Sequence, residues 1–96
     1  MKIGEIRDGD RRVDVTAEVI EKSDTREVKS RYNNESYSVA DAVLEDETGT
    51  IKFTLWNEDI NRIRVGDRVR IENGYTKSFR GAVQLNSGKY GTLTVL

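Results

Sequence analysis

The 96-residue chain contains no cysteine, no histidine and no proline. Without cysteine and histidine it has no disulfide framework, no zinc site, and no thiol or imidazole catalysis. The customary general base near neutral pH is missing too, and a metal site would have to be built from carboxylates and carbonyls alone. These absences favour a binding protein over an enzyme, and no metal or cofactor is expected.

Long hydrophobic runs are also absent. The apolar stretches are far shorter than the ~18 residues of a membrane-spanning helix, and the chain turns polar at once after Met1, unlike a signal peptide. Leu, Ile, Val and Phe nevertheless make up 24 of 96 residues, above the roughly 20% below which chains tend to be disordered. With no repeat and no linker, residues 1–96 are expected to form one cytoplasmic domain without membrane contact.

The charge is nearly balanced overall but unevenly distributed. Sixteen basic and 17 acidic residues give a net charge of −1, which argues against a polycation that coats nucleic acid. Residues 1–72 hold 13 basic and 17 acidic side chains, a sum of −4, whereas residues 73–96 hold three basic and no acidic side chains. Either this is chance, or the last quarter of the chain is kept free of carboxylates because an anion binds there.

The apolar pattern predicts β-strands. Val and Ile number 17 against nine Leu and Ala, and β-branched residues favour strands. Alternation predicts a first strand over residues 13–19, running on towards residue 29, a second over 36–45 and a third over 51–56. In the second strand Val39 and Val43 compete with Ala40, Ala42 and Leu44 for the inward face.

One helix is predicted over residues 57–64, with Asn57 as its N-cap and Ile60 and Ile63 facing the core. Strands are predicted again over residues 68–72 and 82–86, and a last one over 93–96.

Strands that close on themselves leave no exposed edge. The predicted order of three strands, a short helix and two strands matches an all-β, five-stranded OB-fold Greek-key barrel with one short helix between strands 3 and 4. An SH3-like barrel is the main competitor, but it usually has no helix at that point.

Trp56, the only tryptophan, carries the strongest functional signal. It shares the parity of Lys52 and Thr54, opposite to the inward Ile51 and Phe53, so a regular strand places it on the outer face beside a cation. Such a pair suits base stacking and phosphate contact on a single-stranded nucleic acid, at roughly 1–3 kcal/mol per stacked base. The alternative is that Trp56 ends the strand and packs under the helix.

A second cluster lies in the segment YTKSFRG, residues 75–81, where Tyr75 and Phe79 interleave with Lys77 and Arg80 and no acid occurs. This composition is typical of a groove that follows a backbone and stacks its bases. Tyr75 has the inward parity of the preceding strand, and reaches the outer face only if Gly74 marks a bulge that reverses the register. Otherwise Tyr75 belongs to the core, and Phe79 closes the end of the barrel.

Weaker candidates lie elsewhere in the chain. Arg31 precedes the first turn and Tyr32 begins it, and both would let that hairpin fold over a bound strand, although a solvated charged hairpin explains them better. Gln84 alternates outward in the fifth strand with Asn86 and would hydrogen-bond to bases. The Asp46–Glu47 pair is better explained by a tight turn than by metal binding, since no third ligand has a suitable spacing.

Several of these motifs together resemble the archaeal single-stranded-DNA-binding proteins that have one replication-protein-A-type OB domain. The motifs are the DETG turn at residues 46–49, LW at 55–56, YTKSFRG at 75–81 and VQLN at 83–86. IGEI at residues 3–6 also resembles the family's opening, so the likeness covers nearly the whole chain.

The resemblance implies that the chain binds single-stranded DNA with little sequence preference, in DNA replication, repair or recombination, with Trp56, Tyr75 and Phe79 stacking on bases. The resemblance also favours the interpretation in which Gly74 marks a bulge and Tyr75 reaches the outer face. Tyr75 stands where relatives often have tryptophan, so weaker stacking is expected there. The family's C-terminal tail is absent, so a short protein or the DNA-binding domain of a longer chain is expected.

The site expected from pattern and resemblance combines aromatic, cationic and polar side chains. Its members are Trp56, Tyr75, Phe79, Lys52, Thr54, Lys77, Arg80, Gln84, Arg31 and Tyr32. The expected protein is a nucleoid-associated monomer that meets other replication or repair proteins. Two alternatives stay open: an OB domain that binds single-stranded RNA, and a protein-interaction OB domain of a multi-domain replication protein A subunit.

Overall fold

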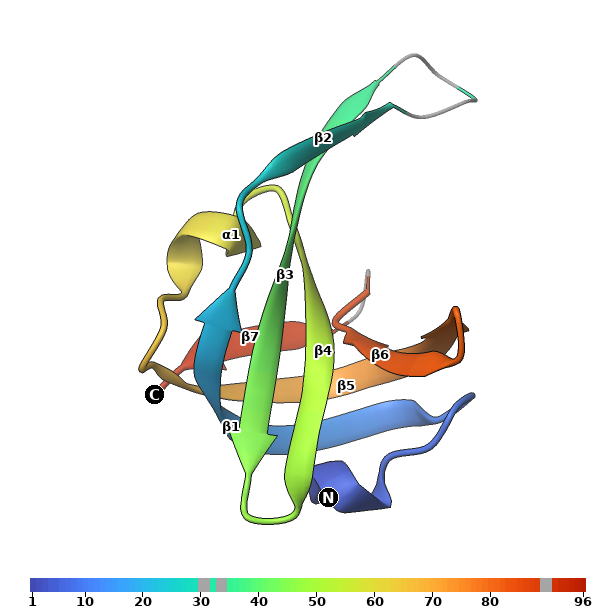
Figure 1. The fold of residues 1–96 in the computed structure, drawn as a ribbon, viewed down its shortest axis with the longest axis vertical. Coiled ribbons are helices and arrows are strands. Elements are labelled where there is room, and N and C mark those ends of the chain that lie inside the picture. The colour runs from blue at the N-terminus through green and yellow to red at the C-terminus, as the bar shows by residue number, and fades with distance from the viewer. Residues whose placement is uncertain (30–31, 33–34, 89–90) are drawn as a thin grey trace.

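The computed structural model describes residues 1–29, 32, 35–88 and 91–96. Strands dominate it, with one 3-10 turn and one short α-helix (Figure 1). The elements in chain order are η1 (Ile3–Glu5), β1 (Arg11–Lys22), β2 (Arg26–Lys29), β3 (Ser36–Asp46), β4 (Gly49–Trp56), α1 (Asp59–Arg62), β5 (Arg68–Phe79), β6 (Ala82–Asn86) and β7 (Thr92–Val95).

Five of the strands close into a barrel. The hydrogen-bonded order is β1-β3-β4-β6-β5, and β1 pairs with β5 to complete the ring. All of these pairings are antiparallel except that of β4 with β6. This topology confirms the predicted all-β barrel with its short helix between the third and fourth barrel strands.

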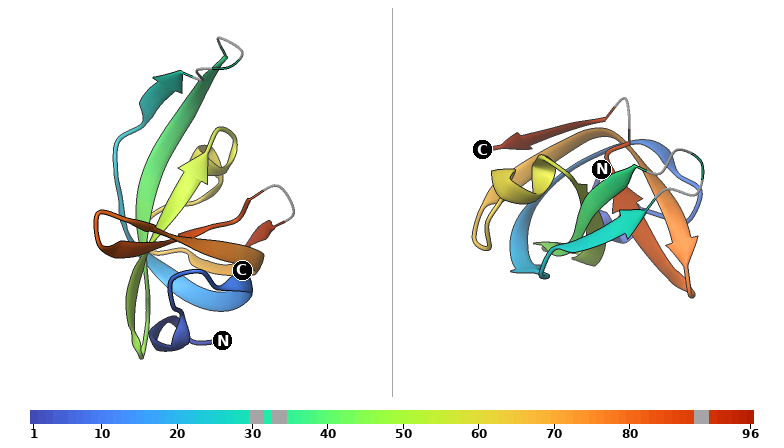
Figure 2. Two further views of the ribbon diagram at one scale, coloured as in Figure 1. Left: turned by 90° about the vertical axis from the view of Figure 1, so that its right-hand side faces the viewer. Right: turned by 90° about the horizontal axis from the view of Figure 1, so that it is seen from above.

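Two further strands extend the barrel. β7 adds to the edge of β5, and β2 pairs with the first part of β3 to form a hairpin that rises above the barrel (Figures 1 and 2). The first strand was expected to run on to residue 29. Instead β1 ends at Lys22 and β2 is a separate strand with all four residues exposed.

The core is made of alternating β-branched and aliphatic side chains around one aromatic ring. Phe53 is fully buried, and in β3 the parity of Ala40, Ala42 and Leu44 faces inward, which settles the competition in that strand. Val39 is buried as well, outside the main cluster, where it lies opposite Trp56 on β4.

The helix is shorter than predicted and starts differently. α1 begins after Glu58, and Asn57 is not its cap: Asn57 has a φ of +49°, and its side-chain oxygen accepts a hydrogen bond from the Ser38 N–H. Ile60 and Ile63 are buried as expected. The Lys22 ammonium donates to the carbonyls of both isoleucines, so a strand side chain holds the end of this single turn.

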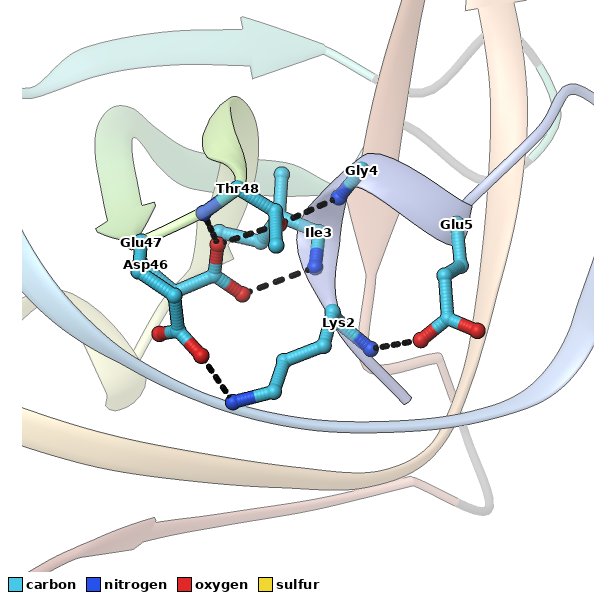
Figure 3. A network of polar contacts seen from close by, with 7 residues as sticks. All are labelled: Lys2, Ile3, Gly4, Glu5, Asp46, Glu47 and Thr48. Carbon is cyan, nitrogen blue, oxygen red and sulfur yellow. Dashed lines mark hydrogen bonds and ion pairs between the residues drawn. The ribbon is translucent and has the colours of Figure 1, made fainter.

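The N-terminal turn η1 is tied to the β3–β4 turn (Figure 3). The Asp46 carboxylate accepts hydrogen bonds from the N–H groups of Ile3 and Thr48 at 2.8 and 2.7 Å, and the Thr48 hydroxyl accepts one from the Gly4 N–H at 2.7 Å. Lys2 forms an ion pair with Glu47. The tight-turn interpretation of Asp46 and Glu47 is confirmed.

Candidate nucleic-acid interface

The outer face of β4 presents the predicted row of Lys52, Thr54 and Trp56. Because Ile51, Phe53 and Leu55 fill the core, the intervening side chains face the other way. Trp56 is 40% exposed, and its ring makes an edge-to-face contact with Tyr37 at a centroid separation of 6.3 Å. Trp56 is therefore held on the surface rather than under the helix, whereas Thr54 is largely covered.

A bulge in β5 decides the position of Tyr75. Val15 pairs with Ile71 but Val13 pairs with Gly74, so β5 contains one residue more than β1 across this interval. Asn73, with a φ of +56°, lies in the extra stretch. The alternation reverses there, so Gly74 becomes buried and Tyr75 becomes 41% exposed. The predicted reversal is confirmed, with the strained backbone one residue earlier than expected.

Beyond the bulge, β5 continues to the tip of the β5–β6 hairpin and carries Lys77 and Phe79 on the same outer face as Tyr75. Phe79 is 56% exposed, and the Arg80 guanidinium lies 5.3 Å from the centre of its ring. Arg80 and Gly81 both have a positive φ and form the reversal. Phe79 thus sits at a hairpin tip and does not close the barrel end.

The strand register joins these side chains across the sheet. Gln84 of β6 pairs with Lys52 of β4 on one side and with Lys77 of β5 on the other. Asn86 likewise lies between Thr54 and Tyr75. The parallel β4–β6 pairing is what brings two segments more than twenty residues apart in the sequence into one surface.

These residues line one open groove, which we call the aromatic groove. Its lining residues come from β4 and from the β2–β3 and β5–β6 hairpins, whose backbones Figure 2 shows. Three exposed aromatic rings and four basic side chains share it. Its lining comprises Arg26, Val28, Val39, Asp41, Lys52, Thr54, Trp56, Tyr75, Lys77, Phe79, Arg80, Ala82, Gln84 and Asn86.

Eight of the ten predicted site residues line the aromatic groove. Tyr32 does not, and is 98% exposed. Arg31 lies outside the described residues. Sequence reasoning missed Arg26 and Val28, because it treated residues 25–29 as the end of the first strand and gave them no face. It missed Asp41, because the inward face of the second strand was left open.

Asp41 is the one carboxylate in the lining, and Arg26 pairs with it at 3.2 Å. The remaining cations of the groove, Lys52, Lys77 and Arg80, have no ion pair with any described residue. A surface that combines exposed rings with unpaired cations suits a ligand that carries both flat apolar groups and negative charge.

The perturbed carboxylates lie away from this groove, at the β3–β4 turn. Partial burial acts to raise the pKa of Asp46, but the hydrogen bonds from Ile3 and Thr48 outweigh it and hold that pKa below its usual value. The hydrogen bond and charge of Glu47 raise the pKa of Lys2, which in turn lowers the pKa of Glu47. Among the described residues no three potential metal ligands cluster together.

Comparison with protein families gives a single assignment. The family model described as "Single-stranded DNA binding protein Ssb-like, OB fold" matches residues 11–95. The chain belongs to this Ssb-like OB-fold family. The match contains the whole barrel and every residue of the aromatic groove.

Two archaeal proteins are among the relatives that the chain resembles. The single-stranded DNA binding protein Ssb of Saccharolobus solfataricus is 38% identical over 87 residues, which cover 91% of this chain and 57% of that protein. Replication factor A of Methanothermobacter thermautotrophicus is 36% identical over 93 residues, 93% of this chain but only 12% of that protein. The chain thus spans little more than half of the first relative and a small part of the second.

A solved structure supports the same fold. The solution structure of the replication factor A related protein from Methanobacterium thermoautotrophicum superposes with a TM-score of 0.81 at 25% identity, covering 100% of this chain and 89% of that one. The predicted OB fold and the resemblance to the archaeal family are both confirmed. Within the described ranges, no helix is long and apolar enough to cross a membrane.

Proposed function

We propose that this Ssb-like OB domain binds single-stranded DNA with little sequence preference. Bases would stack on Trp56, Tyr75 and Phe79, and phosphates would contact Lys52, Lys77 and Arg80. The observation that carries the proposal is that three exposed rings from two strands line one groove together with three cations that pair with no described residue. Every base has a π-face, so stacking of this kind tolerates any sequence.

The family and the named relatives support this choice of ligand. The matched family and the S. solfataricus relative are described as single-stranded DNA binding proteins. We infer a non-enzymatic role in replication, repair or recombination, with the chain acting as a monomer at the nucleoid and meeting other replication or repair proteins.

Intrinsic fluorescence is the direct test, because the only tryptophan lies in the groove. Titration with oligo-dT should quench Trp56, with a site size of about 4–16 nucleotides. Contacts from Lys52, Lys77 and Arg80 give an expected slope of roughly −2 in log K against log salt, at about −0.7 per contacted phosphate of a single strand. An emission that oligo-dT leaves unchanged would contradict the proposal.

Substitutions of groove residues test which side chains contact the DNA. By the anisotropy of a labelled oligonucleotide, Trp56→Ala or Phe79→Ala should weaken binding by about 5- to 150-fold, equivalent to about 1–3 kcal/mol per lost base stack. Val65→Ala is the matched control, since Val65 is 60% exposed and lies outside the aromatic groove. Equal affinity of Trp56→Ala and Val65→Ala for oligo-dT would refute this assignment of the site.

The same titration separates the two alternatives. Matched oligo-U that binds more tightly than oligo-dT would indicate an RNA-binding domain, because RNA-binding sites distinguish the 2′-hydroxyl. Failure to bind either oligonucleotide would indicate a protein-interaction domain instead.

A further inference from the structure

A second groove adjoins the aromatic groove on the other side of Tyr75. It lies where the start of β1 meets the β5 bulge and the segment that follows β6, and it is lined by Arg11, Arg12, Asn73, Gly74, Ser87 and Gly88, with Gly9 and Thr76 completing it. Tyr75 and Lys77 line both grooves. We call this second surface the arginine groove.

Tyr75 forms the wall between the two grooves. Arg11 pairs directly with Tyr75 across the β1–β5 ladder. On the other side Gly88 approaches the ring so closely that a Cβ at this position would lie 2.7 Å from Tyr75 Cε1. The backbone of Tyr75 is therefore paired with β1, and its ring lies against the segment that follows β6. Because Tyr75 lines both grooves, a chain that crosses it passes from one groove into the other.

The arginine groove is suited to an anion. Arg11, Arg12 and Lys77 line it, and its lining contains no carboxylate. Neither arginine has an ion pair with any described residue. Two nearby acids lie outside the lining and accept backbone hydrogen bonds: Asp10 accepts one from the Arg7 N–H and Asp14 accepts one from the Asn73 N–H, both at 2.8 Å.

The backbone conformation of Arg12 supports an anion-binding role for the arginine groove. β1 contains one residue more than β5 between Arg11 and Val13, and Arg12 is that residue, with a φ of +54°. A positive φ is uncommon for a side chain of this size. The bulge at Arg12 leaves two consecutive arginines, both exposed, lining one groove.

We propose that a bound single strand continues past Tyr75 out of the aromatic groove, and that Arg11 and Arg12 contact its backbone phosphates in the arginine groove. This inference rests on the proposed function. It adds a phosphate-binding segment of the DNA path, formed by β1, to a site in which the sequence analysis expected no contribution from that strand.

The test compares short and long oligonucleotides with the variant Arg11→Gln/Arg12→Gln. Wild-type affinity should rise with oligo-dT length beyond the length that fills the aromatic groove. The double variant should lose about fivefold or more on long oligonucleotides and nothing on short ones. Its salt slope on long oligonucleotides should be shallower by about 1.4, or about 0.7 for each of two lost phosphate contacts.

Two controls isolate the effect. Arg64→Gln removes an exposed charge that lines neither groove, and should leave both affinities within twofold of wild type and the salt slope unchanged. Arg11→Gln alone, at a position with ordinary backbone geometry, should show about half of the change in slope and guards against a folding defect at Arg12.

The outcomes distinguish this inference from the proposed function. Quenching of Trp56 with an unchanged slope in the double variant would refute the path through the arginine groove and leave the aromatic groove standing. An equal loss on short and long oligonucleotides would refute it too, since the arginines would then act on the first groove. If wild type binds no oligo-dT at all, the proposed function fails and this inference fails with it.

Discussion

Gly74 is a buried position that leaves little room for a side chain, and replacing it by alanine tests the bulge that places Tyr75. A Cβ there would lie 3.0 Å from the Asn86 carbonyl oxygen, 3.1 Å from Ile71 Cγ2 and 3.2 Å from Leu85 Cδ1. The oxygen belongs to the backbone of β6, which pairs with β5 at this point, so it cannot move without disturbing the ladder.

Two opposing effects set the magnitude. Gly74 does not have a positive φ, so alanine would by itself stabilise the protein by ~0.4–1 kcal/mol through the unfolded chain. Overpacking of a buried position costs ~1–3 kcal/mol. The crowding should outweigh the entropy gain, and Gly74→Ala should lower the free energy of unfolding by about 1–2 kcal/mol. For a domain of this size that corresponds to a Tm lower by roughly 4–16 °C.

Urea and thermal unfolding followed by circular dichroism measure the effect. Gly81 provides the matched control, because it separates backbone strain from steric crowding: its φ is +80°, but nothing lies within 4 Å of a Cβ built there. Asparagine tolerates positive φ better than alanine, so Asn should be the milder substitution at Gly81 and the harsher one at Gly74. A Gly74→Ala protein as stable as wild type would refute the crowding argument.

Two further predictions concern the carboxylates. The pKa of Asp46 is lowered in the folded state, so its contribution to stability is present above the ordinary pKa of about 3.9 and is lost as the pH falls through the folded value. Asp46→Asn should therefore flatten the fall in Tm between about pH 5 and about pH 2. A profile of Tm against pH that the substitution leaves unchanged would contradict the role of these hydrogen bonds. Asp41→Asn removes the one carboxylate of the aromatic groove and frees Arg26. It should tighten oligo-dT binding by about two- to fivefold, in line with the small energies of exposed charges. Weaker binding measured by anisotropy would show instead that Asp41 supports the site.

Much of the barrel could be predicted because strand alternation is a local property. The third predicted strand placed Phe53 inside and Trp56 outside, and the structure agrees. The helix was harder: Asn57 has the chemistry of a cap, but its side chain bonds to Ser38 on a neighbouring strand. That partner is 19 residues away, and no local pattern records it.

The candidate site, like the fold, could be predicted from the sequence only in part. The sequence alone determined which residue types are present, the parity within each strand, and the concentration of rings and cations in residues 75–81. Tertiary structure decided that the parallel β4–β6 pairing unites Lys52 with Lys77 through Gln84, and that β1 and β2 add Arg11, Arg12 and Arg26 to the surface. The reason is physical: side-chain alternation depends on the backbone of one strand, whereas register, bulges and grooves depend on which strand lies beside it.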